Sequence, residues 1–533
     1  ADIFSLNEDQ FLGKETIDGS AAGGQGTFIL SQSTSFNTNN YFTYTPKLNE
    51  NNKLNAVLGM SYLQNDTKGS SATGEQYPSD AIKNLSGSTS ITGATSTDAR
   101  YTFLSYFLRG NYSFRDKYLV SASIRTDGSS RFGPNNRYGW FPSASVGWVL
   151  SEEGFLKNIS FLNFLKLRAS WGLTGNAEIG ESNFLSLYTV SNYPGLPGFT
   201  PAQLGDPDLK WEKTAQTDIG LEFGVLKSRI SGEIDVYKKH TTDLLLGINI
   251  PATTGYTTIL KNLGTMDNKG IEVLLNSNNL VGKFKWSTSL NFAYNKNKVT
   301  DIKGQIIESG FVLVQRAVEG EPIGVFYGQK FLGVDPKTGE ALYLGEDDKP
   351  TSDFSQAKRV VLGESVPDWT GGFTNTFSYA GFDLSVFFYF VQGNKVNNSG
   401  AYFQSDGFYN GFDNQTVDVL NAWQKPGDVT NVPRIGYFYG SGYQETASRW
   451  LYDGSYIRLR NVTFGYTLPK SVAKTLHIQS ARIYAMGINL WTKTDYPADP
   501  EVNTVTLGNI SNGEDFYTIP QPKTITVGLN VKF

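Results

Sequence analysis

The stretch TITVGLNVKF (Thr524–Phe533) ends the chain and alternates strictly between apolar and polar residues. The apolar positions are Ile525, Val527, Leu529, Val531 and Phe533. This period of two predicts a β-strand whose two faces meet different surroundings. Chain termini are usually frayed and polar, so a strand this strongly patterned at the very end indicates that it belongs to a larger sheet.

Two kinds of antiparallel sheet are compatible with such a strand. In a β-sandwich, the apolar face meets a hydrophobic core and the polar face meets water. In a transmembrane β-barrel, the apolar face meets lipid and the polar face lines a wet lumen. One strand does not separate these two folds, so the rest of the chain has to decide between them.

The composition narrows the class of protein. The 533 residues include 46 Lys and Arg against 50 Asp and Glu, and this net charge of −4 suggests no nucleic-acid partner. The mean hydropathy is −0.31, and no apolar run is long enough for a helical membrane span. A β-barrel stays compatible with a polar average, because alternation hides its lipid face. With no Cys and two His, we expect neither thiolate chemistry nor a His-rich metal site, and no cofactor.

The same alternation recurs along the chain. Residues 104–114 and 118–124 alternate on either side of Arg115-Asp116-Lys117, and residues 382–390 alternate after Ala380-Gly381. Many of these strands reach about 10 residues or more, whereas ordinary strands have roughly 5–6 and a tilted membrane strand needs about 9–11. The apolar faces begin or end in aromatic residues, as an interfacial girdle requires. These lengths favour the barrel.

The connections between strands alternate in length. Tight turns at 115–117, 227–228 and 380–381 take turns with long polar loops over 68–97, 176–208, 301–319 and 397–450. Short turns on one rim and long loops on the other are typical of outer-membrane barrels. We therefore predict an all-β fold, a transmembrane antiparallel β-barrel of roughly 14–16 strands from Asn37 onward, with long extracellular loops.

Three local features are also predicted. In SYIRLRNVTFGYTLP (455–469) the apolar phase slips at Arg460-Asn461, which indicates a β-bulge unless the strand starts later. A small hairpin outside the membrane is expected over Gly328–Leu344. One short loop helix is expected over Asp413–Gln424, because its apolar residues follow a helical spacing before a Pro-Gly stop.

Longer motifs resemble a known family. The stretch GDPDLKWEKTAQTDIGLEFG (Gly205–Gly224) is similar to a hallmark of SusC/RagA-type TonB-dependent transporters of the Bacteroidetes outer membrane. RTDGSSRFGPNNRYGWFPSASVGWVLSEE (Arg125–Glu153), SRWLYDGSYIRLRNVTFGYTLP (Ser448–Pro469) and TDYPADPEVN (Thr494–Asn503) resemble the same family. Phe533 also resembles the terminal signal by which barrel-assembly machinery recognises a last strand.

The resemblance implies a two-part protein. It consists of an N-terminal plug, preceded by a TonB-contacting segment, and a barrel of about 22 strands. Residues 1–36 look like a weakly patterned lead-in and not like a plug, so we expect residues 37–533 to be the C-terminal portion of the barrel. Cleavage, disorder or a separate chain would each account for the missing part, and a self-contained smaller barrel is the alternative.

The resemblance also implies a function. It is TonB-dependent import of a bulky nutrient, a glycan or an oligopeptide, across the cell outer membrane. The implied partners are a SusD-like surface lipoprotein, TonB through the missing N-terminal part, and outer-membrane lipid, with no nucleic acid and no enzymatic activity. A passive porin, or a structural or assembly subunit of a larger outer-membrane complex, is the alternative.

The loop GAYFQSDGFYNGF (Gly400–Phe412) supplies the candidate binding residues. Its aromatic residues are Tyr402, Phe403, Phe408, Tyr409 and Phe412. Aromatic faces flanked by hydrogen-bonding groups bind sugars and peptides, so we expect these residues to contact substrate or the lid lipoprotein. Packing within the loop is the alternative, and no catalytic or metal-binding residue is predicted.

Overall fold

The computed structural model describes residues 1–193, 196–405, 414–435, 447–504 and 510–533. The chain divides into two compact units. Unit 1 comprises Ala1–Val146, Trp171–Ala215 and Asp243–Asn262, and unit 2 comprises Gly147–Ser170, Gln216–Thr242 and Leu263–Phe533.

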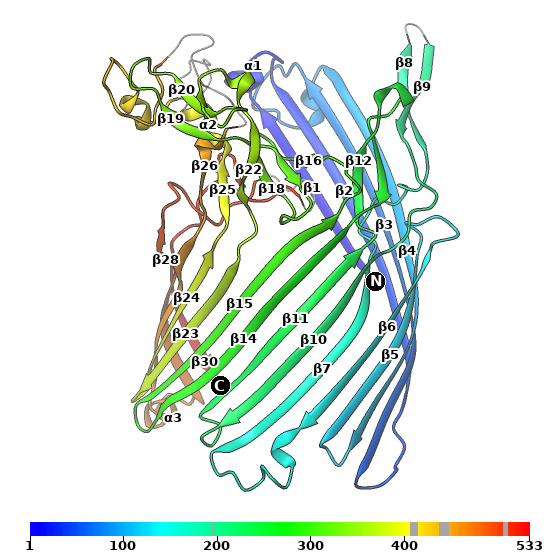
Figure 1. The fold of residues 1–533 in the computed structure, drawn as a ribbon, viewed down its shortest axis with the longest axis vertical. Coiled ribbons are helices and arrows are strands. Elements are labelled where there is room, and N and C mark those ends of the chain that lie inside the picture. Colours follow the sequence, from blue (N-terminus) through cyan, green and yellow to red (C-terminus); the bar gives the residue numbers. More distant parts are fainter. Residues whose placement is uncertain (194–195, 406–413, 436–446, 505–509) are drawn as a thin grey trace. The chain divides into compact units, whose positions relative to one another are not determined.

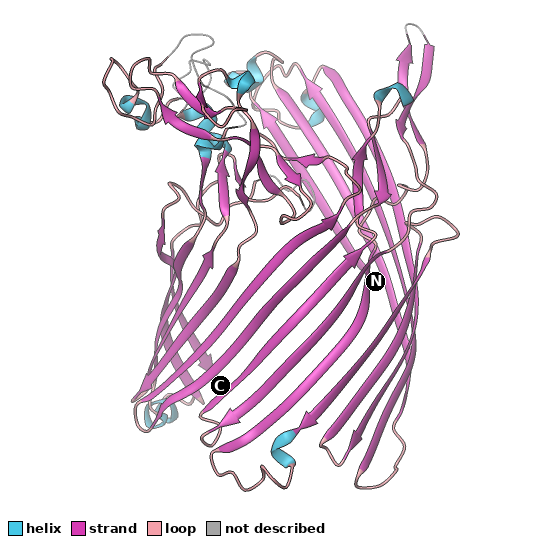
Figure 2. Cartoon of the chain, viewed as in Figure 1, coloured by secondary structure: helices cyan, strands magenta, loops and turns pink. Residues whose placement is uncertain are grey.

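Sixteen strands form one hydrogen-bonded sheet in which their order is their order along the chain (Figures 1 and 2). They are β1 (Asp2–Leu12), β2 (Gln25–Tyr44), β3 (Asn52–Glu75), β4 (Ser90–Phe114), β5 (Tyr118–Ser129), β6 (Tyr138–Val149), β7 (Leu162–Asn176), β10 (Glu212–Val225), β11 (Ile230–Thr242), β14 (Thr265–Val281), β15 (Lys285–Asp301), β23 (Trp369–Tyr379), β24 (Phe382–Gln392), β27 (Tyr456–Thr467), β28 (Ser480–Thr494) and β30 (Thr524–Lys532). The pairing is antiparallel, as in the registers of β2 with β3 and of β14 with β15. The predicted all-β antiparallel fold and the predicted strand number are confirmed.

Within the described residues, the long connections carry five smaller sheets. In unit 1 these are the hairpins β8 (Leu187–Tyr193) with β9 (Leu196–Gln203) and β12 (Leu245–Asn249) with β13 (Thr258–Asn262). In unit 2 one sheet joins β16 (Ile307–Ser309), β17 (Gln315–Ala317), β18 (Val325–Gln329) and β22 (Arg359–Glu364), a second joins β19 (Phe331–Val334), β20 (Ala341–Leu344) and β21 (Pro350–Thr351), and a third joins β25 (Lys395–Asn398), β26 (Leu451–Asp453) and β29 (Glu514–Asp515). The hairpin predicted around Gly328–Leu344 is confirmed as β19 and β20, outside the large sheet.

The helices are short (Figure 2). The α-helices of the described residues are α1 (Ile17–Ser20), α2 (Ser399–Gln404) and α3 (Lys470–Thr475), and the 3₁₀ helices are η1 (Leu85–Gly87), η2 (Leu150–Glu152), η3 (Ala252–Thr254), η4 (Phe354–Gln356), η5 (Val417–Asn421) and η6 (Ser448–Trp450). Within these residues we find no helix with the length and hydropathy that a membrane crossing requires.

The single loop helix predicted over Asp413–Gln424 is wrong in extent and type. The described part of this segment contains only the 3₁₀ helix η5, and Asp413 lies outside the described residues. The apolar spacing that suggested an α-helix places Val417, Leu420 and Trp423 three residues apart, which equally fits the three residues per turn of a 3₁₀ helix. Val417 and Leu420 are each 78% exposed, so no packed face extends the helix.

The predicted tight turns are confirmed. β4 and β5 are joined at Arg115 and Asp116, whose φ angles are both 54°, and β23 and β24 are joined by Ala380 (φ 50°) and Gly381 (φ 88°). Two consecutive positive φ angles match the turn twist to the twist of the strands. Each of these turns fixes the register of its strand pair, and the long connections leave the opposite ends of the same strands.

The predicted bulge is also confirmed. Phe387 of β24 lies opposite Asn461, and its neighbour Phe388 lies opposite Leu459, which leaves Arg460 as the extra residue of β27. An extra residue exchanges the two faces of a strand. Consequently Arg458 shares a face with Asn461, and the apolar residues before and after the bulge share the other face.

The apolar face of the sheet is exposed in unit 2. Ile525 and Val527 of β30 are 78% and 71% exposed, while Thr526 between them is half-buried. From Phe284, just before β15, to Tyr294 the chain advances about 33 Å at roughly 3.3 Å per residue. At a tilt of about 40° this length spans the apolar band of about 25 Å of a membrane barrel.

The boundary expected at residue 37 is too late. Residues 2–12 form β1, which pairs along its whole length with the first half of β2. Its apolar residues, Ile3, Phe4, Leu6, Phe11 and Leu12, do not alternate regularly with polar ones, so its apolar alternation is weak. Its backbone hydrogen bonds to the neighbouring strand nevertheless place it in the sheet.

Candidate functional site

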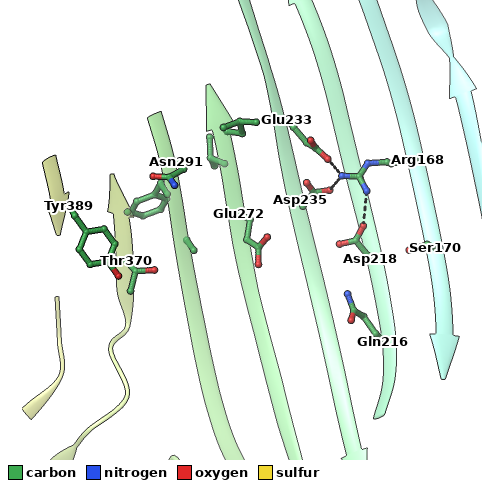
Figure 3. Close-up of a pocket in the computed structure, with 15 residues that line it drawn as sticks. Arg168, Ser170, Gln216, Asp218, Glu233, Asp235, Glu272, Asn291, Thr370 and Tyr389 are labelled. Atoms are coloured by element: carbon green, nitrogen blue, oxygen red, sulfur yellow. Dashed lines mark hydrogen bonds and ion pairs between the residues drawn. The ribbon is translucent and has the colours of Figure 1, made fainter. Parts of the chain in front are cut away.

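A pocket of about 610 Å³ lies on the polar face of the sheet in unit 2 (Figure 3). Residues of seven neighbouring strands, from β7 to β24, line it. Its polar lining consists of Arg168, Ser170, Gln216, Asp218, Glu233, Asp235, Glu272, Asn291, Thr370 and Tyr389. This lining is the candidate functional site.

Arg168 on β7 is the centre of the charges in this pocket (Figure 3). Its guanidinium donates to Asp235 Oδ1 at 2.7 Å and to Glu233, both on β11. The same group lies 3.6 Å from Asp218 Oδ1 and 3.4 Å from Glu222 Oε1, both on β10. One cation therefore contacts carboxylates of two strands and offsets their mutual repulsion.

Gly220 on β10 makes this arrangement possible. A Cβ atom at this position would lie 2.2 Å from Asp235 Oδ1 and 2.6 Å from Arg168 Nε. Because β10 lies between β7 and β11 in the sheet, the guanidinium has to cross β10 to reach Asp235. The missing side chain leaves the space for that crossing.

The pocket wall has an excess of negative charge. Its lining carboxylates are Asp218, Glu233, Asp235 and Glu272, and its lining cation is Arg168. Next to the lining, Lys166 Nζ lies 2.9 Å from Glu222 Oε1, so these two charges offset each other. The amides and hydroxyls of Gln216, Asn291, Thr370 and Tyr389 add donors and acceptors. In the described ranges no cluster of three or more His, Asp and Glu side chains is placed to hold a metal ion. Such a wall can bind a polar solute by hydrogen bonds and favours cationic groups on it.

The aromatic residues predicted as contacts are only partly described. Tyr402 and Phe403 lie in α2 and are half-buried, whereas Phe408, Tyr409 and Phe412 lie outside the described residues. The rings of Tyr402 and Phe403 are 4.8 Å apart, and Phe403 lies 5.7 Å from Phe516. Phe403 thus packs against the connection between β28 and β30.

That connection is anchored to the sheet by a buried ionic network. Arg458 of β27 lies 2.5 Å from Asp499 and 2.8 Å from Glu501, and Arg460 binds both oxygens of Glu501. Burial favours the neutral form of Asp499, but hydrogen bonds from the Glu501 amide, Arg458 and the Gln521 amide hold the pKa of Asp499 below its ordinary value. The network holds the connection in place with ionised groups.

A second buried group joins the same connection to the small sheets. Glu514 is fully buried and accepts hydrogen bonds from Asn397 and Ser399, both at 3.0 Å. Beside it, Tyr496 donates to Asp515 at 2.7 Å, and burial together with this hydrogen bond raises the pKa of the Tyr496 phenol. The described parts of this connection, residues 495–504 and 510–523, are therefore packed within unit 2.

Sequence reasoning missed the pocket because its residues are spread over more than two hundred positions. The acidic residues of β10 and β11 are visible in TDIGLEF and GEIDVY as charges between apolar positions. Their partner Arg168 precedes Asp218 by 50 residues and carries no local signal. Only the order of the strands reveals that these groups meet.

Comparison with known proteins gives a consistent result. Residues 4–490 match the family model described as TonB dependent receptor-like, beta-barrel. The chain is 34% identical to the TonB-dependent receptor P3 of Formosa agariphila over 97% of this chain and 54% of that protein. It is 32% identical to the TonB-dependent receptor SusC of Bacteroides thetaiotaomicron over 82% of this chain and 44% of that protein.

A solved structure shares the fold. The structure of the RagAB peptide transporter matches 96% of this chain and 56% of that chain, with a TM-score of 0.84 and 29% sequence identity. The chain thus spans about half the length of the relatives that it matches.

Proposed function

Because the chain belongs to the TonB-dependent receptor-like β-barrel family, we propose that the whole protein imports a bulky nutrient, a glycan or an oligopeptide. The chain is part of an outer-membrane β-barrel of the SusC/RagA type. Import by such a protein breaks no bond, so we assign no catalytic residue. The similarity to SusC and to the RagAB peptide transporter carries the proposal.

The polar pocket supports this proposal. Its lining combines carboxylates, amides, hydroxyls and one bridging arginine on the face of the sheet opposite the exposed apolar residues. A solute that passes along this face exchanges its hydrogen bonds with water for hydrogen bonds with the wall. The negative charge excess favours substrates with amino or guanidinium groups, so an oligopeptide fits this wall better than an acidic glycan.

We propose three partners for the whole protein: a SusD-like surface lipoprotein, TonB and outer-membrane lipid. A SusD-like surface lipoprotein would close over the long connections, and TonB would act through an N-terminal part that this chain does not include. Further strands from that part would pair with β1 and β30, which in the described residues have one neighbour each. These partners follow from the family and from the open edges of the sheet.

We propose that Tyr402 and Phe403 contact either the substrate or the lipoprotein. Both residues lie beside the long connections, at the end of the sheet away from the tight turns. Half-buried aromatic rings at this end can stack on sugar rings or on peptide groups. The predicted contacts Phe408, Tyr409 and Phe412 belong to the same proposal.

An uptake experiment tests the proposed import. Cells that carry the whole protein as their only importer would be given a fluorescent oligopeptide or a fluorescent oligosaccharide, with and without a functional tonB gene. Energised uptake of one of the two that requires TonB supports the proposal. Uptake that continues without TonB would identify a passive porin. If neither probe is taken up and the protein purifies in a stable complex with other envelope proteins, a structural subunit would be favoured.

Cysteine labelling tests the placement of the contact residues. Tyr402→Cys and Leu420→Cys variants of the whole protein should react with a membrane-impermeant maleimide in intact cells, and co-expression of the lipoprotein should slow the reaction at position 402. A cysteine at Asp116, on a tight turn, is the matched control and should react only after the outer membrane is permeabilised. The reverse pattern would contradict the assigned topology.

A further inference from the structure

Three lysines form one row across neighbouring strands of unit 2. The register places Lys238 of β11 opposite Lys269 of β14, and Lys269 opposite Lys296 of β15. These strands lie side by side (Figure 1), and all three side chains are exposed. Like charges directly opposite each other destabilise a sheet. The fold alone gives no reason for this row.

The lysines lie on the apolar face of the sheet. In β11 the residues at positions 234, 236, 238 and 240 are exposed, and those between them are half-buried. Lys238 therefore shares a face with Ile234 and Val236, whereas Asp235 points into the pocket on the other face. The row is thus separate from the candidate import site.

Nearby carboxylates neutralise these three charges only in part. In the next row His240 pairs with Asp267 at 2.6 Å, and Lys238 lies 4.0 Å from the same carboxylate. Across the part of the chain that the structure describes, no ion pair joins Lys269 or Lys296 to a carboxylate. Glu364 on β22 interacts with Lys296 electrostatically, but the two side chains do not form an ion pair.

The position of the row along the strands identifies its surroundings. One step toward the tight turns, Val236 lies opposite Ile271, and Ile271 lies opposite Tyr294. Tyr294 packs against Trp369 with 4.3 Å between the ring centroids, so aromatic residues end the apolar band here. Along each strand the lysine lies about two residues beyond the apolar band, toward the long connections. That depth is where lipid headgroups lie.

We propose that Lys238, Lys269 and Lys296 bind the phosphate of an anionic lipid headgroup in the leaflet at the long-connection end of the strands. Each lysine is a compact charge on a flexible stem, which binds phosphate well. The stems lie along the apolar face and bring the ammonium groups to the headgroup. The acyl chains run down over Val236 and Ile271. The proposal depends on the membrane position of the sheet and not on the identity of the substrate.

Native mass spectrometry of the whole protein in a neutral detergent tests this proposal. The probes are dimyristoyl phosphatidylglycerol and dimyristoyl phosphatidylcholine, which share their acyl chains and differ in headgroup charge. The wild type should retain phosphatidylglycerol in preference to phosphatidylcholine. The triple variant Lys238→Gln, Lys269→Gln and Lys296→Gln should bind phosphatidylglycerol on the order of a hundredfold more weakly, since each lysine near an anionic surface contributes an electrostatic attraction.

Two further variants make the result specific. The triple variant with Arg at the same positions keeps the charges and should retain the lipid. The variant Lys330→Gln, Lys337→Gln and Lys349→Gln removes three exposed charges outside the large sheet and should also retain it. A heat-modifiable band on electrophoresis shows that each variant is folded. If the triple Gln variant does not fold, the single variant Lys269→Gln replaces it, because removing the central charge relieves the repulsion from both Lys238 and Lys296.

Competition separates the lipid from free phosphate. Inorganic phosphate at a moderate concentration should not displace phosphatidylglycerol, because it lacks the acyl chains that hold the lipid against the sheet. Displacement of the lipid by inorganic phosphate alone would overturn the proposal in favour of a simple anion site. Equal retention of the two lipids by the wild type, or retention unchanged in the folded Gln variants, would also overturn it.

Discussion

Arg458 at the start of β27 and Asp499 in the connection after β28 form an ion pair in which both side chains are buried. Arg458 Nη2 lies 2.5 Å from Asp499 Oδ1, and the side chains are 2% and 6% exposed. The partners are 41 positions apart in the chain. A buried pair loses far more when one partner is removed than an exposed pair does.

Replacing Arg458 with Gln should therefore be strongly destabilising. Asp499 would remain buried without its cation, and we expect the free energy of unfolding to fall by about 3–5 kcal/mol. Urea unfolding of the whole protein in lipid vesicles measures this loss. Arg460→Gln is the matched control, because Arg460 and its partner Glu501 are 34% and 26% exposed, and it should cost about 1 kcal/mol. Equal losses for the two variants would contradict the importance of burial.

The contribution of Asp499 should depend on pH in one direction. Its folded-state pKa is held below the ordinary value of about 3.9, so its stabilising effect is complete above that value and is lost as the pH falls through the lower, folded-state pKa. The stability difference between wild type and Asp499→Asn should stay constant from pH 7 to pH 5 and shrink only below about pH 4. Thermal unfolding of both proteins across this range checks the expectation. A difference that disappears between pH 7 and pH 5 would show that the group is not held ionised.

The two faces of β30 should respond differently to a charge. Leu529, next to the middle of the strand, is 65% exposed on the apolar face. Leu529→Arg should cost about 2–4 kcal/mol if the residue meets lipid near the midplane. Thr526→Arg places the same side chain on the polar face and should be tolerated. Heat-modifiability and urea unfolding in vesicles compare them, and equal tolerance at both positions would argue against the membrane assignment.

Gly220→Ala should disturb the candidate pocket. The new methyl group would meet Asp235 Oδ1 and Arg168 Nε, so the guanidinium has to move and loses at least one charge-assisted hydrogen bond, a cost of about 1.5–3 kcal/mol. Substrate uptake and unfolding measure the effect. Gly110→Ala on β4 is the matched control, since its Cβ would meet nothing within 4 Å, and it should be neutral or slightly stabilising. A harmless Gly220→Ala would mean that Arg168 does not depend on this space.

The chain by itself should not form a stable barrel. In the described residues β1 pairs with β2 alone and β30 with β28 alone, and open sheet edges are not tolerated in lipid. Expressed without additional strands, the chain should aggregate or give no heat-modifiable band. Co-expression with the N-terminal part of the whole protein should restore the band. A monodisperse barrel from this chain alone would support the smaller, self-contained barrel.

Local pattern was enough to predict the strands, the turns and even the bulge. The bulge at Arg460-Asn461 can be recognised in the sequence because an exchange of faces shifts which positions of the strand are apolar. Turns such as Ala380-Gly381 can be recognised because each lies between two segments in which apolar and polar residues alternate. The pattern did not predict strands in segments where apolar and polar residues alternate only weakly. In residues 2–12, for example, backbone hydrogen bonds to β2 determine the strand.

The groups that meet across strands could not be predicted from pattern. Lys238 and Lys296 belong to segments that look like ordinary strand ends, and their row follows from the register of three strands. The same holds for Arg168 and Asp235. The aromatic-rich loop could be proposed as a site because its composition is evident in one short stretch of sequence. The charged cluster of β7, β10 and β11 could not, because it becomes apparent only when the order of the strands in the sheet is known.

The extra residue at Arg460 has a consequence for the order in which the sheet is assembled. It turns Arg458 away from the apolar face, and the carboxylates that neutralise Arg458 arrive only with the connection that follows β28. If β27 took its place in the sheet before that connection, Arg458 would be buried without the carboxylates that neutralise it, which is costly. We therefore expect β27, β28 and their following connection to insert as one step, so that the one extra residue in β27 sets the size of this unit of insertion, which β30 then completes.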